Sequence, residues 1–179
     1  SEYNIKLVCF DTYVTCIVQD YLIKRIKQLN ENNTPLETIG EIFNNVIEST
    51  NTILIPNDLK HLKRGGRLTP LAYGIAEILK IIPILKINKS TDGKIDVLSK
   101  VRTYKNAWNN TLSIMEEEIK TEAYLITIAH VDALDKAKQC EISLKETFPN
   151  CKIQIVELCN VVAAHTGLDC IAIQYFREL

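Results

Sequence analysis

The sequence predicts an α/β fold, in which helices cover both faces of a sheet of mixed strands to give α/β/α layers. Short apolar runs alternate with segments of helical spacing, and one hairpin signal interrupts this alternation. In addition, 46% of the 179 residues are hydrophobic, which is enough to bury one substantial core. Alternating strands and helices are typical of sheets covered by helices, and a hairpin adds antiparallel pairing.

The first fifty residues predict one strand and two helices. Residues 5–10 form a short apolar run that ends at Asp11, as a buried strand would. Apolar residues at helical spacing over 22–29 predict the first helix. The second helix is predicted over 36–47, and Thr34-Pro35-Leu36-Glu37 has the sequence of a capping box that places proline at the first helical position.

The middle of the chain predicts a strand, two short helices and a hairpin. Residues 52–55 resemble a strand that Pro56 stops, and a helix from about Asn57 is expected to end at Gly65-Gly66. A further helix starts at Thr69-Pro70. Two apolar runs, residues 83–87 and 95–98, flank the turn sequence Thr91-Asp92-Gly93-Lys94 and predict an antiparallel pair.

The last third predicts helices from residue 104 and over 133–148, the latter capped by Asp132, and strands over 124–128 and 153–158. Residues 168–176 are apolar enough for either a helix or a strand, so their state stays open. A modest boundary near Thr50-Asn51 divides the chain into residues 1–50 and 51–179.

Charge and cysteine patterns exclude several classes of function. The 21 Lys and Arg balance 22 Asp and Glu, which argues against nucleic-acid or membrane-surface binding. No apolar run approaches the roughly 20 residues of a membrane span, and residues 1–4 lack the basic start of a signal peptide, so we expect a cytoplasmic protein.

The six cysteines form no CxxC pair, so we expect reduced thiols and no metal site. Those at 9, 140, 151 and 170 lie in apolar stretches, as buried thiols would. We expect no cofactor.

Two clusters could recognise an anion, and each has a plain structural alternative. Lys60, Lys63, Arg64 and Arg67 surround Gly65-Gly66, where backbone N–H groups and cations suit phosphate or carboxylate. The same pattern is typical of a helix C-terminus, where cations favour the dipole. Lys100 and Arg102 lie at a strand-to-helix junction, and they are either ligand contacts or solvated residues.

The segment His165-Thr166-Gly167 follows the last predicted strand. A histidine and a hydroxyl ahead of a glycine could bind a carboxylate through two donors, or could form an ordinary capped turn. No hydrolase, Walker A or dinucleotide motif occurs in the sequence, so no catalytic residue is predicted.

Four segments, in this order, resemble the DegV family of bacterial fatty-acid-binding proteins: residues 58–68, Pro83-Ile84-Leu85 with 92–95, Lys100-Val101-Arg102-Thr103, and Ala164-His165-Thr166-Gly167. The chain resembles the C-terminal two-thirds of that family, without the serine-glycine-rich loop of its first domain. By this resemblance, residues 1–50 would be the remainder of a first α/β domain, and residues 51–179 a DegV-like lipid-binding domain.

The resemblance implies a carrier and not an enzyme. A long-chain fatty acid would lie in an apolar tunnel, and its carboxylate would be presented to a separate fatty-acid kinase that makes the acyl phosphate. His165 and Thr166 are similar to the residues that complete the carboxylate site, and Arg67, Lys100 and Arg102 resemble basic groups facing the kinase. The candidates for the wall around the acyl chain are Leu71, Ile75, Ile78 and Leu79.

Departures from the family pattern keep two alternatives open. Ala163, Leu168 and Asp169 stand where the family has glycine, proline and glycine, and Asp169 is expected to repel a carboxylate ligand. The alternatives are a small phosphate-handling enzyme that uses the Lys63–Arg67 turn, and a degenerate interaction domain that binds no lipid.

Overall fold

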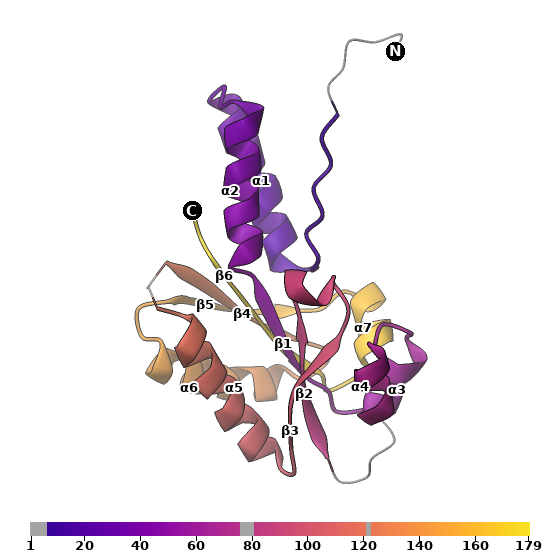
Figure 1. Cartoon of the computed structure of the whole chain (residues 1–179). Coiled ribbons are helices and arrows are strands. Elements are labelled where there is room, and N and C mark those ends of the chain that lie inside the picture. Colours follow the sequence, from indigo (N-terminus) through magenta and orange to yellow (C-terminus); the bar gives the residue numbers. More distant parts are fainter. Residues whose placement is uncertain (1–6, 76–80, 121–122) are drawn as a thin grey trace.

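The computed structural model describes residues 7–75, 81–120 and 123–179 and shows a mixed sheet with helices on both faces (Figure 1). Within these residues, six strands follow the order β3-β2-β1-β6-β4-β5. The strands are Asn51–Ile55 (β1), Ile82–Ile87 (β2), Asp96–Val101 (β3), Tyr124–His130 (β4), Lys152–Glu157 (β5) and Ile171–Arg177 (β6). The predicted layered α/β fold with mixed strands is confirmed.

The strand directions bring four carboxyl ends to one edge of the sheet. β4 pairs with β5 in parallel, and β6 runs antiparallel to both β1 and β4. It follows that β1, β4 and β5 point the same way, and so does β3, because β2 is antiparallel to both β1 and β3. β2 and β3 form the predicted hairpin, closed by the short helix η1 (Lys89–Thr91) and by Asp92 and Gly93 in left-handed conformation.

The helices divide between the two faces of the sheet, as Figure 1 shows for α5 and α6 on one side and α3, α4 and α7 on the other. The helix bounds are Ile17–Glu31 (α1), Leu36–Glu48 (α2), Leu59–Arg64 (α3), Pro70–Ile75 (α4), Tyr104–Glu118 (α5), Leu134–Thr147 (α6) and Asn160–Thr166 (α7). In the part of the chain so described, no helix has the length and apolarity needed to cross a bilayer.

The face under α5 and α6 is a continuous apolar core. Alternate strand residues point into it, among them Ile53, Ile128 and Ile173, each at most 2% exposed. Burial of a side chain of this size contributes about 1.5–3 kcal/mol. This face therefore supplies much of the stability of the fold.

The opposite face is divided into two apolar clusters. One cluster, with Leu54, Ala129 and Ala172, lies under α3 and α7. The other surrounds Phe176 and joins the sheet to the hairpin of α1 and α2. Between the two clusters runs a row of polar side chains, and the candidate site lies next to this row. This polar row consists of Thr52, Gln174, Thr127 and Gln154, each of which is the direct partner of the next across the strands.

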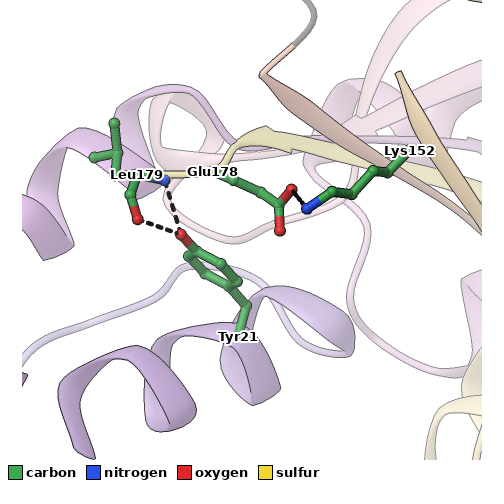
Figure 2. Close-up of polar contacts among 4 residues, drawn as sticks. All are labelled: Tyr21, Lys152, Glu178 and Leu179. Carbon is green, nitrogen blue, oxygen red and sulfur yellow. Dashed lines mark hydrogen bonds and ion pairs between the residues drawn. The ribbon is translucent and has the colours of Figure 1, made fainter. Parts of the chain in front are cut away.

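The base of α1 is fastened to the residues that follow β6 (Figure 2). The Tyr21 hydroxyl donates to Leu179 O at 2.9 Å and accepts from Leu179 N at 2.8 Å. Beside it, Lys152 Nζ of β5 lies 2.6 Å from Glu178 Oε2. These contacts hold α1 against the sheet, and the loop that precedes α1 forms part of the site.

Several local predictions are wrong. Residues 7–10 form no strand and Leu7 is 83% exposed, while residues 5 and 6 lie outside the described ranges. Neither Thr34 nor Asp132 caps a helix: Pro35 and Ala133 occupy the N-cap positions, without side-chain capping bonds. Cys9 is exposed, whereas burial raises the pKa of Cys140 to about 11, as expected for a thiol in the core.

Candidate functional site

A cavity of about 550 Å³ lies on the second face of the sheet, beside α3 and α7. Its floor includes Leu54, Ala129 and Ala172. Ala129 and Ala172 are direct partners across β4 and β6, and two methyl side chains there leave space that larger residues would fill. Because β1, β4 and β5 end at this edge, α3 and α7, which follow β1 and β5, stand beside the cavity.

The loop Asp11–Cys16 forms another wall of the cavity. Its turn is held internally, since Asp11 Oδ1 accepts from Tyr13 N at 2.8 Å and the Thr12 hydroxyl donates to Val14 O at 2.8 Å. The loop packs closely on the hairpin, where a Cβ added to Gly93 would lie 2.9 Å from Tyr13 O. Sequence reasoning missed this wall because nothing in residues 11–16 resembles a regular element.

The Lys63–Arg67 turn lies at the C-terminal end of α3. Asp58 caps the N-terminus, with its Oδ1 accepting from Lys60 N at 2.8 Å and from His61 N at 3.1 Å. The helix ends at Arg64, Gly65 is its C-cap residue, and Gly66 takes a positive φ of 67°. The segment therefore ends a helix, as one of the two interpretations expected, and Arg67, which is exposed, lines the cavity. Anion recognition by this turn stays a prediction.

Contact between α3 and α7 fixes the position of His165. An added Cβ at Gly65 would lie only 3.1 Å from His165 Nδ1, and one at Gly167 would lie 3.2 Å from the ring of His61. The His61 Nε2 lies 2.7 Å from Ala164 O. A carbonyl oxygen can only accept, so Nε2 is the donor. Each histidine thus packs on a glycine of the other segment.

Arg67 and His165 both line the cavity, from different elements. Neither side chain has a hydrogen bond or ion pair to another described residue. Thr166 also lines the cavity, but its hydroxyl donates to Val162 O at 3.1 Å. It can donate to a ligand only after its hydroxyl rotates. Arg67 and His165 together offer donors and positive charge to an anionic group.

Asp169 does not face the cavity. Its Oδ1 lies 3.0 Å from Lys136 Nζ of α6, and Asp169 is not among the lining residues. The expected repulsion of a carboxylate is therefore opposed by a neighbouring cation. Cys170, next in sequence, is buried beside Thr166, and burial raises its pKa to about 12, so that its thiol is neutral at physiological pH.

The remaining predicted basic residues lie elsewhere. Arg67 is adjacent to the start of β3, since Arg67 O accepts from Ile95 N at 3.0 Å. Lys100 stands five residues further along that strand, roughly 16 Å away at 3.3 Å per residue. Neither Lys100 nor Arg102 lines the cavity.

Leu71 and Ile75, the two described residues of the predicted acyl-chain wall, do not line this cavity. Leu71 is 63% exposed, and Ile75, although only 5% exposed, is not a lining residue. Ile78 and Leu79 lie outside the described residues. The two residues at helical spacing on α4 therefore differ in environment: Leu71 is exposed to solvent, whereas Ile75 is buried.

Metal chemistry finds no support in the described ranges, where no group of three His, Cys, Asp or Glu side chains could hold an ion. The cavity instead combines an apolar floor with cations at one part of its wall. That arrangement suits an amphiphile with a single anionic end.

Comparison with known proteins identifies one family. The model of the family described as "Uncharacterised protein, DegV family" matches residues 1–178. A DegV domain-containing protein of Halalkalibacterium halodurans is 29% identical over 176 residues, 98% of this chain and 61% of the relative. The chain therefore spans about three fifths of the length of such relatives.

Solved structures agree with the fold. A fatty acid binding DegV family protein of Streptococcus agalactiae has a TM-score of 0.89 and 30% identity, with 98% of this chain and 62% of the other covered. DegV of Bacillus subtilis, described as a fatty acid binding protein, has a TM-score of 0.82 at 22% identity, with 98% and 62% covered. The family match over nearly the entire sequence decides the assignment: the chain belongs to the DegV family.

Proposed function

We propose that this chain binds a long-chain fatty acid, with the hydrocarbon in the cavity and the carboxylate between Arg67 and His165. The observation that carries the proposal is the convergence of two donors without protein partners, from α7 and from the turn after α3, on one mostly apolar cavity. Each methylene buried contributes about 0.8 kcal/mol, so a long chain binds tightly with few polar contacts. The fatty acids named for structural relatives, stearic acid and heptadecanoic acid, support this ligand class.

We further propose that the bound acid is a substrate for a separate fatty-acid kinase. In that reaction a carboxylate oxygen takes the γ-phosphoryl group of ATP, and ADP leaves. Arg67 is exposed where it lines the cavity, so the carboxylate would lie near the surface and within reach of a partner enzyme. The chain itself would supply binding and orientation.

Titration of delipidated protein with stearic acid tests the binding site. Arg67→Ala and His165→Ala should each weaken binding about tenfold or more, because a hydrogen bond to a charged group is worth about 1.5–3 kcal/mol. Lys138→Ala removes an exposed cation from α6, on the other face of the sheet, and should leave the Kd unchanged. Equal affinities for all four proteins would refute the site.

The kinase step has its own assay. Acyl phosphate formation by an added bacterial fatty-acid kinase should depend on this protein and decline in Arg67→Ala even when that variant is saturated with acid. Binding without any acyl phosphate would leave a fatty-acid-binding protein and remove the kinase from the proposal.

A further inference from the structure

His61, on α3, contacts the backbone of α7 on both sides of His165. Its Nε2 donates to Ala164 O at 2.7 Å, and a Cβ added to Gly167 would lie 3.2 Å from its ring. Ala164 directly precedes His165, and Gly167 is the C-cap residue of the helix. His61 itself does not line the cavity. Its contacts therefore act on the backbone that carries His165 and not on a ligand.

The hydrogen bond from His61 completes the last turn of α7. The last four carbonyl groups of a helix have no partner within it, and Ala164 O is one of those four in α7. Because His61 belongs to α3, its bond joins the turn that carries His165 to the helix that precedes Arg67. The two residues proposed to hold the carboxylate are thereby linked to each other.

Two glycines keep this contact close. Gly167 has a positive φ of 81°, and a side chain there would meet the His61 ring. Gly65 lies against the His165 ring, since a Cβ at Gly65 would be 3.1 Å from His165 Nδ1. α3 therefore supports both the backbone and the ring of His165. A binding group has to be kept within about 0.5 Å of its productive position, and these contacts supply such support.

We infer, on the basis of the proposed fatty-acid function, that His61 is a positioning residue for the carboxylate site. It acts through Ala164 O and the end of α7, which keep His165 in place. Loss of the His61 donor should therefore weaken the hold on the carboxylate and spare the contacts of the hydrocarbon. A residue that only stabilised the fold would affect both ends of the ligand alike.

Two ligands with the same hydrocarbon chain test this inference: stearic acid, which carries a carboxylate, and octadecanol, which does not. His61→Phe retains a ring to pack on Gly167 but lacks the donor. In delipidated protein it should weaken stearic acid binding about three- to tenfold, the equivalent of one hydrogen bond, and leave the Kd of octadecanol nearly unchanged. His61→Gln again offers an amide donor to Ala164 O and should restore most of the affinity for the acid.

Ser49→Ala is the matched control. Ser49, at the end of α2, likewise joins a helix to the backbone of another element, because its Oγ accepts from Arg177 N at 2.9 Å. Neither of these two residues lines the cavity. Loss of the Ser49 hydroxyl should therefore leave the binding of both ligands unchanged.

A double variant tests whether His61 acts through His165. Because the two histidines belong to one unit, His61→Phe combined with His165→Ala should bind stearic acid as weakly as His165→Ala does alone. Independent contributions would instead multiply the two losses.

Three results would overturn the inference: unchanged stearic acid binding by His61→Phe, an equal loss for octadecanol, or a further loss of the same size in the His165→Ala background. If wild-type protein binds no stearic acid, the proposed function fails, and if His165→Ala binds it as tightly as wild type does, the proposed carboxylate site fails. In either case this inference falls as well. His61→Leu, which also lacks the donor and has a smaller side chain, replaces His61→Phe if that variant does not fold.

Discussion

The two faces of the sheet are built from neighbouring residues but are packed differently. Ile173 faces α5 and α6 in a closed apolar core, whereas Ala172 and Gln174 on either side of it face the cavity and the polar row. Large branched side chains fill the first face, while small and polar ones occupy the second. The alternation of a single strand thus separates the packed core from the candidate site.

The two faces also differ in whether their polar groups have hydrogen-bond partners within the protein. In the closed face, Tyr175 reaches out of the core to donate to Glu118 Oε2 at 2.6 Å, and burial together with this carboxylate raises the pKa of the phenol. In the open face, Arg67, His165 and Thr52 retain donors without protein acceptors among the described residues. Hydrogen-bond donors without protein acceptors that gather around one cavity indicate a site where a ligand supplies the acceptors.

The largest expected effect is a loss of stability, and it should differ between the two faces because they are packed differently. Ile173→Ala should destabilise the protein by about 3–5 kcal/mol, because the closed core cannot collapse around the lost atoms. Leu54→Ala removes as many carbons from a residue that already borders empty space, so about 2–3 kcal/mol is expected. Urea unfolding of both variants measures the difference, and equal losses would contradict the contrast between a filled face and a hollow one.

Small-to-large substitutions test the same difference in packing between the two faces. Ala172→Leu places three carbons in the cavity and should weaken stearic acid binding by about 2 kcal/mol, roughly thirtyfold in Kd, because the side chain displaces about that much ligand. Its thermal stability should change little. Ala137→Leu on α6 introduces the same side chain into the closed core and should cost about 1–3 kcal/mol of stability without a direct effect on binding.

If Ala172→Leu instead unfolds the protein as readily as Ala137→Leu does, the space at Ala172 is not available to a ligand. Calorimetric unfolding without ligand distinguishes the two results. Fatty-acid titration is then compared between variants that are fully folded.

A smaller effect concerns the two glycines of the α3 turn. In Gly65→Ala the new methyl would lie 3.1 Å from His165 Nδ1, so the imidazole must shift by tenths of an ångström, and we expect fatty-acid binding about three- to tenfold weaker. Gly66→Ala meets nothing within 4 Å but strains a positive φ of 67°, which costs about 1 kcal/mol of stability. Titration and thermal unfolding should therefore rank the two variants in opposite orders.

The sequence predicted most elements because their signals are local. The helices over 17–31 and 36–48 follow apolar spacing, and the β2–β3 hairpin follows the Asp92-Gly93 turn. The sequence does not decide between helix and strand for residues 168–176, because β6 is central and a strand buried on both faces lacks the alternation that identifies a strand. The strand expected over 5–10 failed for 7–10 because an apolar run becomes a strand only where a partner strand is present.

The site was predictable only in part. Arg67, His165 and Thr166 were found from their residue types, and the structure places all three around one cavity. The cavity itself depends on the register that sets Ala129 opposite Ala172, which no local pattern specifies. Gln174 carries a usable signal, since a lone glutamine in an apolar strand requires hydrogen-bond partners.

The smallest expected effect concerns the ion pair behind the site. Lys136 and Asp169 are each more than 40% exposed, so Lys136→Ala should change stability by no more than about 1 kcal/mol. Without that cation, the field of Asp169 should oppose a bound carboxylate and weaken binding about two- to threefold at low salt. At high salt the effect should vanish, because screening suppresses interactions between exposed charges.

Lys136→Arg keeps the charge and should bind as wild type does, whereas Asp169→Asn should bind slightly more tightly. A Kd for Lys136→Ala equal to that of wild-type protein at low salt would show that Asp169 does not influence the ligand. The altered turn after His165 would then be electrostatically neutral toward the site, and the hollow face would depend on α3 and α7 alone to hold the carboxylate.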